Sequence, residues 1–214
     1  RQSIQIFCDF SGYTDIAIGC ALLLGYKFKL NFRDPYTAVS IQDFWRRWHI
    51  SLSSWLRDYL YIPMGGSHNG LVRGLFSLLA TMIIGGIWHG SSWQFVFWGI
   101  YHGFLLVFHR LWVQFASPYN WAWRKSSLWK FFSVIVVFHS VTLGWILFRS
   151  SSMSMAINVM RNLILEIRND LFFDRVDLWA VIAILVGLLI QVLPIKWRAI
   201  VEQKIGRLPW IFQG

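Results

Sequence analysis

Histidines are the side chains of this 214-residue sequence best suited to acid–base chemistry, and His89 has the most informative setting. It lies in the run GGIWHG (residues 85–90), at the end of a long apolar stretch. An ionisable side chain there is costly unless it lines a wet cavity or has polar partners. A neutral imidazole can take a proton from a hydroxyl nucleophile. The alternative is a histidine that only holds helices together by hydrogen bonds, and the spacing alone does not decide between them.

His49 is the second candidate. It lies at the edge of an apolar stripe, one helical turn from Trp45 and Ser53 and close to Arg46. That position fits a second catalytic or substrate-orienting group. Taken by itself, the motif favours an inert histidine beside a tryptophan at the membrane interface, because amphipathic side chains commonly lie at such depths.

Three arginines near His49 are candidates for binding a cytosolic cofactor. Arg46, Arg47 and Arg57 carry planar, permanently charged guanidinium groups, which bind phosphates well. Contact with lipid headgroups explains them at least as well. The sequence contains no GxGxxG, Walker or GxSxG motif. None of the six histidines has a metal-binding spacing such as HExxH, so we expect no metal site.

The remaining histidines favour structural roles. His102 and His109 are seven residues apart, on the same helical face as Trp98, where packing and a hydrogen bond to a neighbouring helix are expected. His139 lies in the middle of an apolar stretch, where an interhelical hydrogen bond is again expected. His68 lies in a glycine-rich turn and should be exposed to solvent.

The elements that would carry these residues are strongly hydrophobic. Of all residues, 56% are hydrophobic, 18% aromatic and 14% charged, against about 25% charged residues in soluble domains. This composition excludes a soluble domain and a disordered chain. The 14 Trp and 18 Phe residues are typical of aromatic belts at membrane surfaces. We therefore expect one membrane domain over residues 1–214, as the C-terminal part of a longer protein.

Basic residues outnumber acidic ones by 20 to 10 and lie mostly between the apolar stretches. That arrangement is typical of cytoplasmic loops that face anionic lipids, so the lipid bilayer is the expected partner and nucleic acid is excluded. Placing residues 27–57, 110–130 and 196–207 in the cytoplasm gives a consistent alternation across the membrane.

Apolar stretches that cross or enter a bilayer need about 20 residues per helix. Five qualify, at residues 4–26, 71–88, 93–108, 131–148 and 178–195. They predict an all-α fold, a polytopic transmembrane helical bundle. The third stretch is short for a full crossing, and the first carries Asp9 and Asp15, for each of which we expect a structural ion pair.

A different kind of helix is predicted over residues 40–61. Its first residues, SIQD, resemble a capping box, and apolar residues then recur every three or four positions. Because its arginines lie off this stripe and Pro63 ends it, the helix would be interfacial or re-entrant rather than spanning. The alternative role is to line a substrate entrance. A second amphipathic helix is predicted from Ser152 onward.

Four motifs in this order resemble those of the membrane-bound O-acyltransferases. They are FCDFSGYTDIAIG (7–19), NFRDPY (31–36), DFWRRWHISLS continued by WLRDYLYIP (43–63), and WHG with the later WG and HG pairs (88–103). The turn YIPMGG (61–66) is most similar to the bacterial members that O-acetylate alginate and other exopolysaccharides. Residues 111–214 resemble the family only in their hydropathy and in the triplet LFR (147–149).

The resemblance implies a role for each candidate residue. The family's proposed catalytic histidine corresponds to His89, and a second important histidine corresponds to His49. His89 would act as general base on an incoming hydroxyl, with His49 assisting from the donor side. Arg46, Arg47 and Arg57 would then face the phosphates of the expected acyl donor, acetyl-CoA, with no cofactor bound permanently.

The implied activity is O-acyl transfer in the bacterial inner membrane. An acetyl group from a cytosolic donor would cross the membrane toward an acceptor polysaccharide such as alginate, by way of a periplasmic acetyltransferase partner. Two alternatives stay open. One is D-alanyl or other acyl transfer to teichoic acid or another envelope polymer. The other is a non-enzymatic channel or transporter for such a polymer.

Overall fold

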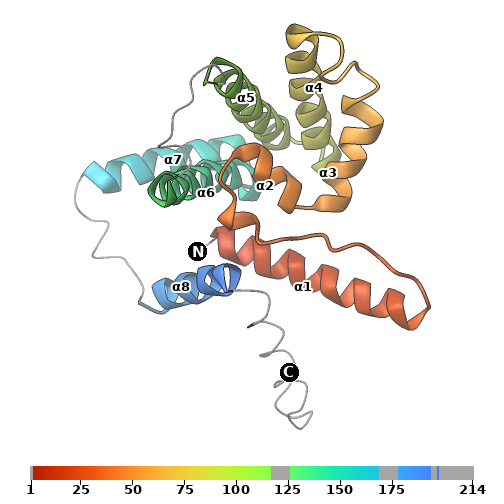
Figure 1. Cartoon of the computed structure of the whole chain (residues 1–214). Coiled ribbons are helices and arrows are strands. Elements are labelled where there is room, and N and C mark those ends of the chain that lie inside the picture. The colour runs from red at the N-terminus through yellow and green to blue at the C-terminus, as the bar shows by residue number, and fades with distance from the viewer. Residues whose placement is uncertain (1, 117–125, 169–177, 194–196, 198–214) are drawn as a thin grey trace.

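The computed structural model describes residues 2–116, 126–168, 178–193 and 197, and these form helices without any strand. Four helices are long and apolar enough to cross a membrane: α1 (Gln2–Leu23), α4 (Leu71–His89), α5 (Trp93–Ala116) and α6 (Ser127–Arg149). The predicted all-α membrane bundle is therefore confirmed (Figure 1).

The third predicted stretch lies within a longer helix, and the fifth extends past the end of its helix. Helix α5 continues past residue 108 to Ala116 and has 24 residues, enough to span a bilayer. Helix α8 (Leu178–Val192) has 15 residues. Residues 194–195 of the fifth stretch lie outside the described residues, as do residues 117–125, 196 and 198–207 of the basic stretches assigned to the cytoplasm.

Helices α4 and α5 form the most closely packed pair of the described fold. Their backbones meet where glycines face the neighbouring helix. A Cβ added at Gly86 would collide with the Phe95 carbonyl oxygen, and one added at Gly99 would collide with the Met82 carbonyl oxygen. Small residues permit helices this close approach. The contact fixes the end of α4, where His89 lies, against the start of α5.

The prediction of one continuous helix over residues 40–61 is wrong. The segment begins as expected, because Ser40 Oγ accepts a hydrogen bond from the Asp43 amide at 3.1 Å, and α2 (Ile41–Arg47) follows. The helix then breaks at Trp48 and His49. Helix α3 (Ile50–Leu56) and a π-helical turn, η2 (Arg57–Tyr61), complete the segment.

The cause of this break lies outside the segment. His49 has a left-handed backbone, with φ 44° and ψ 55°. The Ile50 amide donates to the Asn31 carbonyl at 2.9 Å, and the Arg33 amide donates to the Arg47 carbonyl at 2.9 Å. A continuous helix would pair these groups internally. The preceding loop takes them instead, and no pattern within residues 40–61 contains that information.

An aromatic core supports the broken segment. Trp48 is 4% exposed, stacks on Phe44 with ring centroids 5.6 Å apart, and contacts Trp145 of α6 at 4.9 Å. Tyr36, in the 3₁₀ turn η1 (Pro35–Thr37), donates its hydroxyl to the Ser3 carbonyl of α1 at 2.6 Å. The core thus joins α2 to α6, and η1 to α1. Figure 1 shows the backbones of these helices near one another.

Helix α1 is the least covered of the four long helices. Leu23 and Tyr13 are 89% and 71% exposed, and in Figure 1 the far end of α1 extends away from the other helices. Asp9 and Asp15 are exposed as well, and the ion pairs expected for them are absent among the described residues.

Helix α7 (Met153–Arg168) confirms the second predicted amphipathic helix. It packs against α6 and α5. Its apolar side chains include Met155, Ile157 and Ile164, which are exposed. This arrangement is the one expected of a helix that lies on an apolar surface such as the membrane interface.

Candidate active site

His89, the last residue of α4, lies among aromatic side chains from three helices. Its ring centroid is 5.2 Å from that of Trp98 on α5 and 5.0 Å from that of Phe148 on α6, and both contacts are edge-on. Trp88 and Phe95 lie 4.9 and 6.4 Å away. The half-buried imidazole is thus held in position by α4, α5 and α6 together.

His49 lies at the break between α2 and α3 and not on the helical stripe that the sequence predicts. Its Nδ1 is 3.2 Å from Oδ1 of Asn31, and its ring meets Phe10 of α1 edge-on at 4.8 Å. Burial, and secondarily repulsion from a charge on His89, lowers the pKa of His49 to about 4. The imidazole is therefore neutral at ordinary pH and can accept a proton.

The structure brings the two candidate histidines together. Trp88 contacts both, with ring centroids 6.4 Å from His49 and 4.9 Å from His89. We call His49 and His89 the histidine pair. Residues 40 positions apart in the sequence meet because the broken segment packs beside the end of α4.

The other histidines follow their predictions only in part. His102 is fully buried among Trp45, Trp98 and Trp145, so the predicted packing is confirmed. Neither of its ring nitrogens has a hydrogen-bond partner among the described residues, so the predicted interhelical bond is absent there. His139 lies 2.8 Å from the Ile135 carbonyl of its own helix, and the interhelical bond predicted for it is not found in the part of the chain that the structure describes. His68 is exposed, as predicted.

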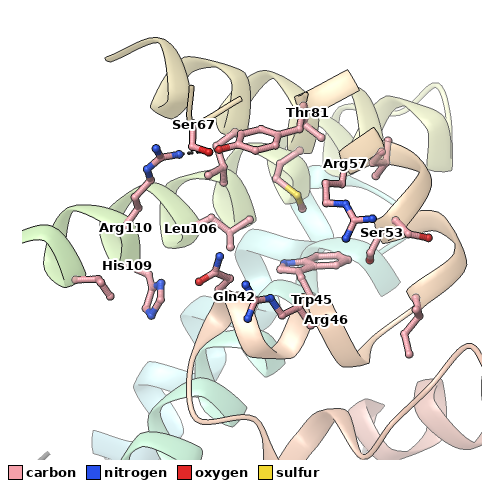
Figure 2. Close-up of a pocket in the computed structure, with 17 residues that line it drawn as sticks. Gln42, Trp45, Arg46, Ser53, Arg57, Ser67, Thr81, Leu106, His109 and Arg110 are labelled. Atoms are coloured by element: carbon pink, nitrogen blue, oxygen red, sulfur yellow. Dashed lines mark hydrogen bonds between the residues drawn. The ribbon is translucent and has the colours of Figure 1, made fainter. Parts of the chain in front are cut away.

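A basic pocket of about 510 Å³ lies between α2, α3 and the adjoining parts of α4 and α5 (Figure 2). Three arginines line it on different sides: Arg46, Arg57 and Arg110. None of the lining residues is acidic, and apolar side chains such as Leu78 and Leu106 form much of the wall. We call it the arginine pocket. Guanidinium groups on a partly apolar wall are well suited to an anionic ligand.

The three arginines proposed from the sequence separate in the structure. Arg46 and Arg57 line the arginine pocket, and Arg57 is paired with the Asp58 carboxylate at 2.7 and 3.1 Å. Arg47 does not, because its guanidinium donates to Asp43 at 2.8 Å and to Thr37 at 3.0 Å. Arg47 therefore holds α2 against η1, which is a structural role.

Sequence reasoning missed Arg110 as a site residue. This side chain, near the end of α5, donates to the Tyr61 hydroxyl at 2.7 Å, the dashed contact in Figure 2. The sequence contained a feature that could have indicated Arg110, because the basic stretches at 27–57 and 110–130 were both assigned to the cytoplasmic side. Basic ends of different elements on one membrane side are candidates for a shared pocket. His109 lines the same pocket and was also missed.

Two tryptophans connect the arginine pocket to the histidine pair. Trp45 lines the pocket, and its ring is 5.7 Å from that of Trp98. Trp98 in turn contacts His89 at 5.2 Å. A ligand in the pocket is therefore separated from His89 by an aromatic wall of two side chains.

Comparison with known proteins identifies the family. The chain matches the membrane-bound O-acyltransferase family over residues 2–157, well over half of its length. The chain belongs to this family. The resemblance of the four sequence motifs is confirmed, and the matched region contains the histidine pair and the arginine pocket.

Curated relatives of this membrane-bound O-acyltransferase are longer proteins. A peptidoglycan O-acetyltransferase of Helicobacter pylori is 39% identical over 162 residues, which are 76% of this chain and 30% of the relative. The probable alginate O-acetylase AlgI of Pseudomonas aeruginosa is 43% identical over 152 residues, 71% of this chain and 28% of the relative. A teichoic acid D-alanyltransferase of Bacillus subtilis is 30% identical over 154 residues, 68% and 38% respectively. The chain thus spans about a third of the length of these relatives.

Proposed function

We propose that the protein transfers an acyl group to a hydroxyl and that the histidine pair provides the general base. One observation carries this proposal: His49 and His89 meet at Trp88, while Trp98 and Trp45 connect them to a basic pocket without acidic residues. A proton acceptor and an anion site thus lie on two sides of one aromatic wall. Acyl transfer from a phosphate-bearing donor needs both.

The proposed reaction is an ester-forming displacement on a thioester. The acceptor hydroxyl oxygen attacks the acyl carbonyl, its proton passes to the imidazole of His89, the new C–O bond forms and the C–S bond breaks. The proton then passes from His89 to the departing thiolate. General-base assistance of this kind contributes about 10²–10⁴-fold in rate. His49 assists from the donor side.

The proposed donor is acetyl-CoA, held through its phosphates by the arginine pocket. Arg46 from the sequence prediction lines that pocket together with Arg110, and these two are the proposed phosphate ligands. Arg57 also lines the pocket, but its guanidinium is paired with Asp58 at 2.7 and 3.1 Å. Arg47 drops out of the proposal because Asp43 and Thr37 occupy its guanidinium. The phosphates would give Arg46 and Arg110 the anionic partners that neither has within the described residues.

We place this chemistry in the bacterial inner membrane, with the arginine pocket on the cytoplasmic side. Basic residues favour that side. The pocket is lined by the middle of α4 and by the C-terminal half of α5, whereas His89 ends α4. The acetyl group would then move outward to a periplasmic acetyltransferase partner and a polysaccharide. Alginate or a related exopolysaccharide is the proposed acceptor, on the 43% identity to the probable alginate O-acetylase of Pseudomonas aeruginosa.

A second acceptor class follows from the other relatives. The Helicobacter pylori relative is named for peptidoglycan and the Bacillus subtilis relative for teichoic acid D-alanylation. Acyl transfer to another envelope polymer, including transfer of a D-alanyl group, is therefore the alternative proposal. It keeps the same histidine pair and changes the donor and the acceptor.

Reconstitution of the protein in liposomes tests the two alternatives together. Labelled acetyl-CoA or a D-alanyl carrier thioester is supplied outside, and mass spectrometry detects the acyl ester on alginate, peptidoglycan or teichoic acid fragments. Acetyl ester on alginate supports the main proposal, and D-alanyl ester on teichoic acid supports the alternative. Absence of any hydroxyl ester with either donor, when the periplasmic partner is included in the assay, contradicts both.

The side of the arginine pocket is testable by labelling. Cys8 and Cys20 are free and exposed, so they are first replaced by serine. Exposed Ser67 lines the pocket, and Ser67→Cys should react with a membrane-impermeant maleimide from the cytoplasmic side only. Acetyl-CoA should slow this reaction. Labelling from the periplasmic side alone would overturn the proposed orientation.

A further inference from the structure

We infer that Asn31 is a positioning residue that holds His49 as the Nδ1–H tautomer and so leaves Nε2 as its proton-accepting atom. Asn31 lies in the loop before η1, 18 positions from His49, and is 8% exposed. It does not line the arginine pocket. The tautomer follows from hydrogen bonding alone, whereas its use in catalysis rests on the proposed acyl transfer.

The amide oxygen of Asn31 collects three contacts. Oδ1 lies 3.1 Å from the Ser51 backbone nitrogen, 2.9 Å from Ser51 Oγ and 3.2 Å from His49 Nδ1. A backbone N–H can only donate, so the Asn31 atom at this point is the carbonyl oxygen and not the amide nitrogen. His49 Nδ1 also lies 3.4 Å from Ser51 Oγ, but that hydroxyl donates its one proton to Asn31 Oδ1. Both neighbours of Nδ1 are then acceptors, so His49 Nδ1 carries the proton. In a neutral imidazole, Nε2 is then unprotonated.

The backbone around His49 keeps the ring in this orientation. His49 has φ 44° and ψ 55°, a conformation that a non-glycine residue adopts at a cost and retains only where its surroundings impose it. The Ile50 amide donates to the Asn31 carbonyl at 2.9 Å, so Asn31 binds both the main chain and the side chain of the turn. Phe10 packs edge-on against the imidazole at 4.8 Å and leaves little room for a ring flip.

The neutrality of Asn31 is as important as its oxygen. Helix α1 presents the ring of Phe10 to His49, and α4 presents Trp88 and His89. His89 is the titratable group among the described residues whose charge acts on His49. A carboxylate in place of Asn31 would stabilise the imidazolium and raise the pKa of His49. The amide fixes the tautomer and leaves the ring neutral.

Nitrogen-15 NMR of histidine-labelled protein in lipid bilayers tests this inference directly. The His49 signals are assigned by their loss in His49→Gln. At pH 7 we expect a protonated Nδ1 and an unprotonated Nε2 in the wild type, a shift toward the Nε2–H form in Asn31→Ala, and a higher titration midpoint in Asn31→Asp. The control Ser51→Ala leaves Oδ1 in place and should keep the wild-type tautomer. An Nε2–H wild type, or an unchanged tautomer in Asn31→Ala, overturns the inference.

A kinetic measurement tests the catalytic consequence separately. Asn31→Ala should lower kcat about 10- to 100-fold, the range found for residues that orient metal-binding histidines. The KM for acetyl-CoA should stay unchanged, because Asn31 lies outside the arginine pocket. In Asn31→Asp the acid limb of kcat should move to higher pH. A rise in KM with unchanged kcat overturns the positioning role. If the wild type transfers no acyl group, the proposed function fails while the NMR result stands.

Discussion

The histidine pair and the arginine pocket differ in what surrounds their key side chains. His49 and His89 contact aromatic rings and an amide, whereas the pocket gathers three arginines, of which Arg57 is paired with Asp58. The difference has a physical reason. A base must become an imidazolium when it takes a proton, and nearby positive charge opposes that step. A phosphate site needs the positive charge that a base must avoid. The fold meets both needs by placing Trp45 and Trp98 between them.

The largest expected effect comes from His89→Gln. Glutamine keeps a hydrogen-bonding group of similar reach but cannot serve as a base. We expect kcat for acyl transfer to fall about 10²–10⁴-fold, with the KM for the donor unchanged because His89 does not line the arginine pocket. The measurement is the rate of ester formation in liposomes at matched protein content.

A structural role for His89 predicts a different outcome. An interhelical hydrogen bond in a membrane contributes only about 0.6 kcal/mol on average, too little to unfold the bundle. If His89→Gln retains near-normal transfer, the aromatic surroundings of His89 serve packing alone. His89 would then not be the general base, and the histidine pair would have no catalytic role through this residue.

The second effect tests the arginine pocket through Arg110→Gln. Loss of a charge-assisted hydrogen bond to a phosphate costs about 1.5–3 kcal/mol, so the KM for acetyl-CoA should rise about 10- to 100-fold with little change in kcat. The effect should shrink at high salt, because ions screen the wild-type attraction. Arg47→Gln is the matched control, since Arg47 donates to Asp43 and Thr37 outside the pocket.

Equal increases in KM for Arg110→Gln and Arg47→Gln would contradict the pocket. They would indicate that total positive charge near the membrane surface, rather than the pocket, attracts the donor. Steady-state kinetics at two salt concentrations separates these outcomes.

The sequence predicted the helices well where one element determines its own pattern. The long apolar stretches became α1, α4, α5 and α6, because hydropathy over about 20 residues is a local property. The SIQD cap formed because Ser40 and Asp43 need only each other. The continuous helix over residues 40–61 failed because the Asn31 and Arg33 backbones take part in the break.

Prediction of the site was limited in the same way, by contacts between residues that are far apart in the sequence. His89 and His49 were singled out from their motifs, but their meeting at Trp88 depends on how the broken segment packs against α4. Arg110 was missed because its partner Tyr61 lies 49 positions away. Arg47 resembled its neighbour Arg46 in sequence, yet the rotation of about 100° between adjacent helical residues directs it to Asp43. Side-chain direction within a charged motif requires the fold.

A smaller effect is expected from Tyr61→Phe. The Tyr61 hydroxyl accepts a hydrogen bond from Arg110 at 2.7 Å and so holds the guanidinium at the pocket wall. Loss of one such bond should raise the KM for acetyl-CoA about 2- to 10-fold, equivalent to about 0.5–1.5 kcal/mol. The double variant with Arg110→Gln should show no further rise. Additive effects in steady-state kinetics would mean that Tyr61 acts on the donor independently of Arg110.

The smallest expected change is the response of His49 to mild acid. An unperturbed histidine with a pKa of 6.5 is about 97% charged at pH 5, whereas burial and His89 lower the pKa of His49 to about 4. Since its pKa is lowered, the imidazole should stay mostly neutral from pH 7 to pH 5 and take up a proton only near pH 4. The nitrogen-15 signals of His49 in lipid bilayers measure this directly. A His49 midpoint near 6.5 would place this ring in water. His49 would then not be the buried, neutral imidazole that distinguishes the histidine pair from the charged pocket.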